Sequence, residues 1–188
     1  MRPVTYSLTT SVDGYVAGPD GDLDWGAPDE ELFVFATEEV RRVDVHLMGR
    51  RLYETMLYWE TAAQEPGQTA LELEFADLWK ALPKVVFSRT LSEVEGSNTR
   101  LATGSLAEEI ERLRAEPGAG SIAIGGATPA AEAIELGLVD EFRRRVHPVL
   151  LGAGTPYFPH RGTKVELELV ECRSFACGVA FLHHRVVR

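Results

Sequence analysis

The alternation of apolar and polar residues divides the chain into short strands and amphipathic helices. Runs rich in β-branched and aromatic residues predict strands at 4–12, 45–48, 84–88, 99–102, 121–125 and 142–150. Apolar residues spaced three or four apart predict helices at 29–43, 50–56, 71–82, 105–115 and 129–136. Segments 165–170 and 179–187 are expected to pair as a closing antiparallel hairpin. The polar stretch 60–69 is expected to be a loop.

The order of these elements predicts the fold class. Strands alternate with helices through the first two thirds of the chain, and a hairpin follows. This order is typical of a three-layer α/β/α domain with a mostly parallel central sheet and a C-terminal antiparallel hairpin. Because no linker or repeat interrupts the pattern, we expect residues 1–188 to form one domain. Ligands of such sheets bind beyond the carboxyl ends of the strands.

Composition and charge narrow the classes of partner. The net charge of −10 argues against a nucleic-acid surface. No apolar run approaches the roughly 20 residues of a membrane span, and the first residues lead into a strand pattern rather than a signal peptide. We therefore expect a cytoplasmic protein that binds a small molecule. Cys172 and Cys177 have no partners at metal-ligand spacing, so no metal site is expected.

Three predicted strand ends carry residues suited to phosphate. Gly125–Gly126 separates a strand from a helix whose first backbone N–H groups are free to bind an anion. Gly49–Arg51 repeats this arrangement and adds two guanidinium groups, which can bind phosphate bidentately. Ser88 and Arg89 stand at the end of a third strand. Two facing helix starts suit a pyrophosphate, and the Ser/Arg pair suits a ribose 2′-phosphate. Together they predict a site for a phosphorylated dinucleotide.

Motifs along the chain resemble two related families. Segments 48–54, 87–89 and 124–126, with the sequences Met-Gly-Arg-Arg-Leu-Tyr-Glu, Phe-Ser-Arg and Ile-Gly-Gly, resemble nucleotide-binding segments of dihydrofolate reductases. Segments 11–17 and 147–158 resemble the reductase domain of bifunctional riboflavin-biosynthesis proteins. The matches follow the family order over nearly the whole length. The chain is thus identified as a member of the dihydrofolate-reductase-like superfamily.

This resemblance implies a cofactor and a reaction. Val16 and Ala17, on a mobile first loop, would approach the nicotinamide of NADPH. The remaining contacts that the resemblance implies are Gly49, Arg50, Arg51, Leu52, Ser88, Arg89, Gly125, Gly126, Ala127 and Thr128. NADPH is a hydride donor, so the implied chemistry is reduction of a C=N or C=O bond in a small pteridine- or pyrimidine-like heterocycle. The resemblance also suggests a homodimer, with the closing hairpin as a possible interface.

Residues around the first helix are candidates for substrate binding. Glu31, Leu32 and Phe35 resemble the acid-Leu-x-x-Phe pattern of the pterin-binding helix in dihydrofolate reductases, which makes Glu31 the candidate proton relay. Trp25 and Tyr53 flank the expected site and are further candidates, with Leu32 and Phe35, for substrate contact. A proton relay inside an apolar cleft should have a raised pKa. The alternative is that Glu31 only complements the helix dipole.

Departures from both families leave the substrate open. Lys84, Val146 and Ala130 stand where dihydrofolate reductases have an arginine, a threonine and a tyrosine that serve folate or its cofactor. Ile124 stands where the riboflavin-pathway reductase has a glutamate, and the companion deaminase domain is absent from the sequence. Besides a reductase of an unidentified heterocycle, two alternatives stay open. One is a true dihydrofolate reductase with weak activity, and the other is a nucleotide-binding module without catalysis.

Overall fold

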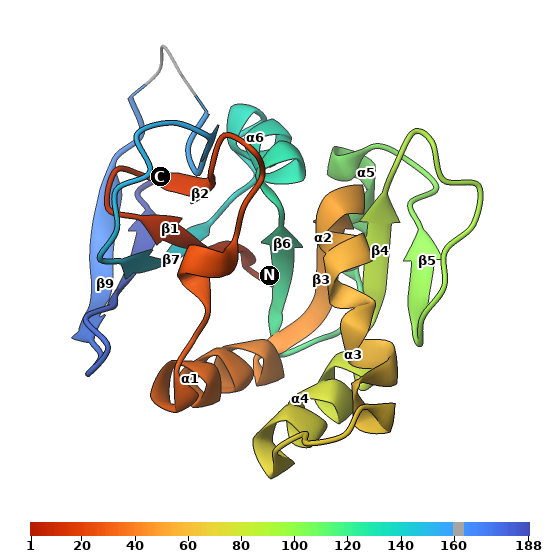
Figure 1. Ribbon diagram of the computed structural model, residues 1–188. Coiled ribbons are helices and arrows are strands. Elements are labelled where there is room, and N and C mark those ends of the chain that lie inside the picture. The colour runs from red at the N-terminus through yellow and green to blue at the C-terminus, as the bar shows by residue number, and fades with distance from the viewer. Residues whose placement is uncertain (160–163) are drawn as a thin grey trace.

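A single twisted sheet of eight strands organises the protein (Figure 1). The computed structural model describes residues 1–159 and 164–188. The strands lie in the order β5-β4-β3-β6-β1-β7-β10-β9. They span Val4–Ser11 (β1), Val43–Gly49 (β3), Lys84–Phe87 (β4), Thr99–Leu101 (β5), Ser121–Gly125 (β6), Glu141–His147 (β7), Leu167–Ser174 (β9) and Ala180–Val186 (β10). All pairs from β5 to β7 are parallel, whereas β10 is antiparallel to β7 and β9. This confirms the predicted fold class.

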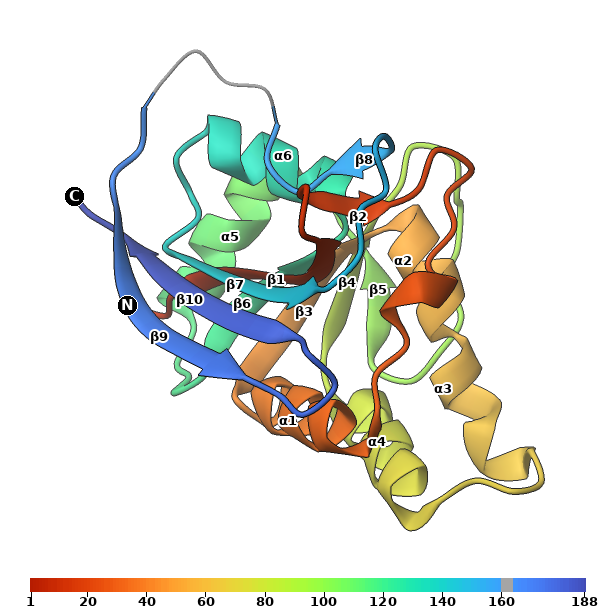
Figure 2. The same ribbon diagram turned by 60° about the vertical axis from the view of Figure 1, so that its left-hand side comes forward.

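Helices cover both faces of the sheet (Figure 2). They are α1 (Glu30–Arg41), α2 (Arg50–Met56), α3 (Tyr58–Thr61), α4 (Ala70–Ala81), α5 (Leu106–Ala115) and α6 (Ala127–Glu135), with short 3₁₀ turns η1 (Asp24–Gly26) and η2 (Ala62–Gln64). Capping side chains define three of the helix starts. Asp29 accepts the Leu32 N–H at α1, and Thr69 and Ser105 form capping boxes at α4 and α5.

Alternation along the strands divides the core between the two faces. Val45 and Leu47 of β3 point into a cluster with α5 and α6, in which Ile110 and Ala133 are fully buried. Met48 points the other way, into a second cluster that includes residues of α2 and α4. The phosphate-suited turns lie between these two apolar layers, at the carboxyl ends of the strands.

Two short strands fasten the first loop. β2 (Tyr15–Ala17) pairs with β8 (Thr155–Pro156), although the two segments are far apart in the sequence. The Asp13 carboxylate accepts the N–H groups of Leu151 at 3.2 Å and Gly152 at 2.7 Å. A Cβ on Gly154 would lie 2.0 Å from the Ala17 carbonyl oxygen, so only glycine allows this approach. The loop expected to be mobile is thus attached to the segment after β7.

Other differences from the predicted elements have local causes. The strand expected to reach residue 150 ends at His147, because Pro148 cannot donate to a sheet ladder. The expected loop at 60–69 contains the end of α3 and η2. β9 is exposed along its whole length as the edge strand of the sheet. In the described ranges 1–159 and 164–188, no helix is both long and apolar enough to span a bilayer.

Candidate functional site

The three strand ends predicted to bind phosphate are neighbours. β3 lies between β4 and β6 in the sheet. In the register of these pairs, Gly49 is level with Phe87, and Met48 is level with Gly125. The turn into α2, the turn into α6 and the loop after β4 therefore leave the same edge of the sheet side by side. The structure brings the predicted cofactor residues of these three segments together.

Both glycine turns are tightly packed. A Cβ on Gly125 would lie 2.3 Å from Leu52 Cδ2 and 2.4 Å from His46 Cε1. Gly126 precedes α6 with φ of +91°, a conformation that L-residues rarely adopt. A Cβ there would lie 3.9 Å from the Gly49 backbone nitrogen, so the two helix starts almost touch. Ala127 and Thr128, the first residues of α6, present backbone N–H groups at this place.

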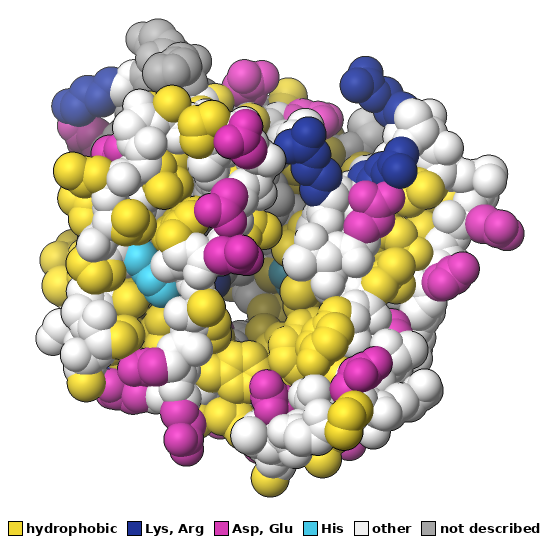
Figure 3. All heavy atoms as spheres, viewed as in Figure 1, with side chains coloured by type: hydrophobic (Ala, Val, Ile, Leu, Met, Phe, Trp, Pro, Cys, Tyr) yellow, Lys and Arg dark blue, Asp and Glu magenta, His cyan; other side chains and the backbone are white. Residues whose placement is uncertain are grey.

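Basic side chains gather beside these turns. Figure 3 shows Lys and Arg side chains over the start of α2 and the loop after β4. Arg50 donates to Glu54 Oε1 at 2.6 Å and to Thr90 Oγ1 at 2.9 Å, which joins α2 to that loop. Ser88 Oγ accepts the N–H groups of Thr90 and Leu91. Arg51 and Arg89 are exposed, and their guanidinium groups have no hydrogen-bond partner in the described part of the chain. They are free to bind an anion.

A hydrophilic stripe lines the sheet face toward α1. Ser7 and Thr9 of β1 and Arg145 of β7 lie on central strands yet remain partly exposed. His147 lies two residues further along β7, on the same face as Arg145. Figure 3 shows the surface hollowed between η1 and α2, above α1. We call this hollow, bounded by η1, α1, α2 and the sheet, the cleft.

The turn η1 forms one wall of the cleft. A Cβ on Gly26 would lie 3.1 Å from Thr9 Cγ2, so the backbone of η1 passes close to β1. Trp25 meets the His147 ring edge-on, with 5.8 Å between ring centroids, and its indole N–H donates to the Asp22 carbonyl. Trp25 is half-buried. The predicted substrate contact Trp25 thus lies beside the stripe of β1 and β7.

Glu31 has no apolar cleft around it. Its side chain is 46% exposed, lies 3.2 Å from Arg173 and accepts the Ala176 N–H. The condition under which we expected a proton relay, enclosure among apolar groups, is therefore not met. The reason is tertiary, since the first turn of α1 faces the β9–β10 hairpin, and nothing in the periodicity of α1 indicated that neighbour.

The other two candidates on α1 also pack against the hairpin. Leu32 is 2% exposed in a cluster with Phe175, Val179 and Phe181. Phe35 contacts the rings of Phe175 and Phe181 with centroid distances of 5.1 and 4.7 Å. Leu32 is thus enclosed between α1 and the hairpin, and its role as a substrate contact stays a prediction. Phe35 serves mainly to seat α1 on β10.

Tyr53 points into the protein rather than into the cleft. It is 7% exposed, and its hydroxyl accepts the Glu95 N–H at 2.7 Å and donates to the Glu95 carbonyl at 3.4 Å. Its phenol group thus anchors the loop after β4. Both functions of its hydroxyl are already used, so this geometry does not favour the substrate contact at Tyr53, which stays a prediction.

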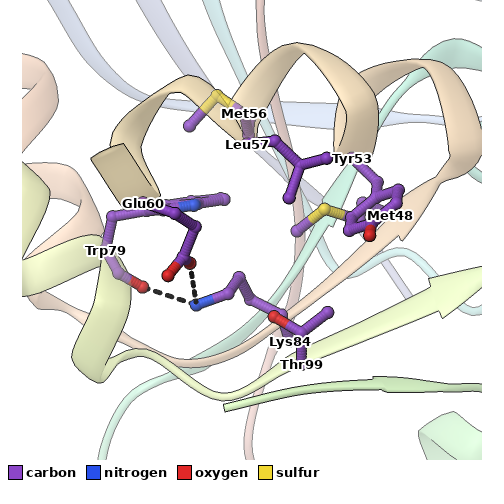
Figure 4. A pocket seen from close by; sticks show the side chains of 8 residues that line it. All are labelled: Met48, Tyr53, Met56, Leu57, Glu60, Trp79, Lys84 and Thr99. Carbon is purple, nitrogen blue, oxygen red and sulfur yellow. Dashed lines mark hydrogen bonds and ion pairs between the residues drawn. The ribbon is translucent and has the colours of Figure 1, made fainter. Parts of the chain in front are cut away.

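Lys84 is also a structural residue. Figure 4 shows its ammonium group in a small internal pocket beside Trp79 and Glu60. The group donates to the carbonyls of Trp79 at 2.6 Å and Leu82 at 2.9 Å, and the side chain is 3% exposed. Burial lowers the pKa of Lys84, and the charge of Glu60 opposes this effect. Lys84 caps the end of α4 and cannot reach a ligand in the cleft.

Two histidines near the site were not predicted to belong to it. Burial lowers the pKa of His46, which packs against Gly125, to about 4. Burial, aided by the charge of Arg145, also lowers the pKa of His147. Both rings are therefore neutral near pH 7. His46 Nδ1 and His147 Nε2 are buried without a hydrogen-bond partner in the described residues. One signal in the sequence could have indicated His147 as a site residue. Arg143, Arg145 and His147 are polar residues at alternate positions of a central strand, where apolar residues are the rule.

No candidate metal centre accompanies these groups. Across residues 1–159 and 164–188, no three His, Cys, Asp or Glu side chains are arranged so that they could hold a metal ion.

The fold and the site together define a class of protein. A mostly parallel sheet ending in an antiparallel hairpin, with glycine turns at adjacent strand ends beside a polar cleft, is a dihydrofolate-reductase-like domain. The family model of the RibD C-terminal domain matches residues 2–181. The chain belongs to this family.

Two proteins of Bacillus subtilis (strain 168) are similar over almost the full length. The uncharacterized protein YyaP is 31% identical over 182 residues, covering 95% of this chain and 92% of its own length. The uncharacterized protein YwjB is 24% identical, and the match covers 97% of each chain.

Solved structures share the fold. A protein assigned provisionally to riboflavin biosynthesis from Shewanella sp. PV-4 has a TM-score of 0.74, 23% identity and full coverage of both chains. A pyrimidine reductase-like protein of Corynebacterium diphtheriae has a TM-score of 0.67 and 15% identity, covering all of this chain and 92% of its own. A Thermotoga maritima diaminohydroxyphosphoribosylaminopyrimidine deaminase/5-amino-6-(5-phosphoribosylamino)uracil reductase has a TM-score of 0.69 and 15% identity. That match covers 99% of this chain and 57% of the other.

Proposed function

We propose that this protein is an NADPH-dependent reductase that transfers hydride to a small pteridine- or pyrimidine-like heterocycle. One observation carries the proposal. The glycine turns before α2 and α6 and the Ser/Arg loop after β4 leave one sheet edge side by side, in a member of the RibD C-terminal domain family. A reductase activity is part of the name of the similar Thermotoga protein, and another neighbour is described as pyrimidine reductase-like.

The residues present fit a phosphorylated dinucleotide. The close approach of Gly126 to Gly49 places two sets of backbone N–H groups together, as a pyrophosphate requires. Arg51 and Arg89, with Ser88 and Arg50 beside them, supply positive charge for a 2′-phosphate. NADPH would supply the hydride when bound. In this proposal Val16 and Ala17, fastened through β8, border the nicotinamide, and Leu52 supports the turn at Gly125.

Folate is a poor candidate for the substrate. The nearest basic residue to the position that serves the folate tail in dihydrofolate reductases is Lys84, and its ammonium group is used by two backbone carbonyls. Glu31 is engaged by Arg173 rather than facing the cleft. The contact with the folate tail and the acid that faces the pterin therefore both lack a suitable residue. This favours a heterocycle other than folate as the substrate.

Nucleotide titration tests the proposal. NADPH and NADH are titrated by isothermal calorimetry, and absorbance at 340 nm is then followed with dihydrofolate, pterins and aminopyrimidine ribityl compounds. We expect NADPH to bind more tightly than NADH, and Arg89→Gln to weaken NADPH roughly tenfold while NADH changes little, because only the 2′-phosphate would lose a partner. Glu93→Gln, at an exposed position on the same loop, is the control.

Each outcome has a defined meaning. Failure of both nucleotides to bind would refute the proposal. Nucleotide binding without oxidation across the whole panel would favour the non-catalytic module. Turnover of dihydrofolate above that of the other compounds would favour the folate alternative. Equal losses of NADPH and NADH affinity in Arg89→Gln would refute the assignment of the 2′-phosphate contact.

We also propose that the protein forms a homodimer. β9 is exposed along its whole length and carries Leu167, Leu169 and Val170 at the surface. An edge strand with apolar side chains is a ready interface for a second copy. Light scattering at two concentrations tests this, and a monomeric mass at both would refute it.

A further inference from the structure

Arg145 occupies an unusual position for a charged residue. It lies in the middle of β7, level with Thr9 of β1 and Phe181 of β10. Its Nη1 group donates to Ser7 Oγ at 3.2 Å, and its Nε group donates to Thr9 Oγ1 at 3.4 Å. Both partners are hydroxyls, so the guanidinium is oriented by neutral groups on the floor of the cleft.

The charge of Arg145 has no ion-pair partner among residues 1–159 and 164–188. Arg143, on the same face, lies 3.3 Å from Glu39 and 2.9 Å from Glu141. For Arg145, no carboxylate oxygen lies within 4.0 Å in the described part of the chain, and Glu39 acts on it only at longer range. Burial lowers the pKa of Arg145, which reflects poor solvation of the cation. A partly buried cation without a counter-ion is costly, which suggests that a ligand supplies the missing charge.

A second group beside Arg145 also lacks a partner. His147 is 6% exposed, and its Nε2 atom is buried without a hydrogen-bond partner among residues 1–159 and 164–188. Its ring lies on the same sheet face as Arg145 and meets Trp25. Buried polar atoms without partners are rare in native proteins and often mark a site that a ligand completes.

We propose that Arg145, with Ser7, Thr9 and His147, binds a carboxylate attached to the planar substrate. A guanidinium can donate two parallel hydrogen bonds to the two oxygens of a carboxylate. The full negative charge of a carboxylate also neutralises the unpaired cation, which a neutral ring carbonyl cannot do. His147 Nε2 offers a further polar contact, and the Trp25 ring lies beside it for a flat group. The inference rests on the proposed function, because it assigns the substrate class of the same cleft.

The rim of the cleft makes this contact decisive. Figure 3 shows acidic side chains on the η1 side of the hollow, and Asp20, Asp22 and Asp24 are exposed in that segment. On this side of the cleft the aspartates repel an approaching anion. The short-range contact with Arg145 is the attraction that we assign to a carboxylate on the cleft floor.

A matched pair of ligands tests the proposal on the full chain without cofactor. Uracil-6-carboxylate and uracil differ only in the carboxylate, and both are titrated by calorimetry, with inorganic phosphate as a third ligand. We expect the carboxylate to bind roughly 10- to 100-fold more tightly than uracil, as charged hydrogen bonds contribute. Arg145→Met should abolish this preference. Arg144→Met removes the same charge from the opposite sheet face and should leave the preference unchanged.

Stability separates a binding role from a structural one. If the role of Arg145 is to bind a ligand, its charge is unpaired in the free protein. Arg145→Met should then keep or raise the Tm of the free protein, because that unpaired charge is removed. Arg143→Met should lower it, because Glu39 and Glu141 lose their partner. A lower Tm in Arg145→Met would assign the residue to the fold and overturn the proposal.

The remaining outcomes are equally clear. Equal binding of uracil-6-carboxylate and uracil to the wild type refutes the proposal without any variant. If Arg145→Met and Arg144→Met lose the preference for uracil-6-carboxylate equally, the preference reflects overall charge and the proposal is refuted. Binding of phosphate in place of the carboxylate also refutes it. Carboxylate preference without NADPH binding would refute the proposed function alone, and NADPH binding without the preference would refute only the inference about Arg145.

Discussion

Replacing Gly125 by alanine tests whether the turn before α6 is sterically closed. The new Cβ would lie 2.3 Å from Leu52 Cδ2 and 2.4 Å from His46 Cε1, distances at which neighbouring atoms must move. The leucine methyl group lies at the end of a flexible side chain and can turn away. The imidazole is held edge-on against Trp79, with 5.4 Å between ring centroids, and has less freedom. The clash must therefore shift either the His46 ring or the turn.

The expected cost follows from two opposing effects. Overpacking a close-packed core costs roughly 1–3 kcal/mol. Replacing glycine returns about 0.4–1 kcal/mol, because the unfolded chain loses conformational freedom. A net loss of about 1–2 kcal/mol remains. For a domain of this size, each 1 kcal/mol corresponds to roughly 2–4 °C in Tm. We therefore expect Gly125→Ala to lower the Tm by roughly 2–8 °C.

Urea unfolding of a double-mutant cycle measures the steric part. Leu52→Ala removes one of the two clashing groups, so the double variant should recover about 1 kcal/mol relative to the sum of the single changes. Gly126→Ala is the matched control, because its nearest contact is 3.8 Å and its cost comes from a φ of +91°. Leu52→Ala should not rescue it. Gly125→Ala as stable as the wild type, or equal rescue of both glycine variants, would refute the reasoning.

Three further predictions concern residues that hold the fold together. Hydrogen bonds from His183 and Arg143 lower the pKa of Glu141 to about 2. The ionised carboxylate therefore stabilises the folded protein fully above about pH 4.5, and this contribution is lost as the pH falls toward 2. Urea unfolding of Glu141→Gln should show less loss over that window than the wild type, and parallel curves would contradict this. Lys84→Met should cost about 1–3 kcal/mol in urea unfolding, because the carbonyls at the end of α4 lose their donor, while NADPH affinity stays unchanged; weaker NADPH binding by a folded variant would contradict it. Asp13→Ala should speed amide hydrogen exchange at Gly152, whereas Asp20→Ala should not, and unchanged exchange would show that the carboxylate does not hold the loop.

The sheet edge that carries the predicted cofactor residues could be predicted, because the sequence signals for it are local. Glycine pairs that break a strand and start a helix depend on backbone geometry within a few residues, and parallel strands place such turns at one edge. The sequence therefore sufficed to predict that Gly49, Ser88 and Gly125 would lie together, which the sheet register confirms. Their binding of NADPH stays a prediction.

The substrate side was less predictable because it depends on distant contacts. The pattern of α1 correctly indicated an amphipathic helix, yet it could not show that Leu32 and Phe35 would pack on the β9–β10 hairpin, which follows more than 120 residues later in the printed sequence. Tyr53 was equally ambiguous, because its hydroxyl partner lies in a loop 42 residues away. A side chain's spacing predicts which face of a helix it occupies, but not which segment covers that face.

The sequence by itself determined the order of strands and helices, the parallel sheet and the glycine turns, because periodicity and backbone preference act over a few residues. Only the tertiary structure decided which polar groups meet in the cleft. Residues 143–145 of β7 are all arginine, and their side chains point alternately to the two faces of the sheet. The residue type therefore does not distinguish one position from another. Arg143 pairs with Glu39 and Glu141, whereas Arg145 donates to the hydroxyls of Ser7 and Thr9 and has no ion-pair partner in the part of the chain that the structure describes. Whether a charge is paired depends on long-range packing, which no local pattern encodes.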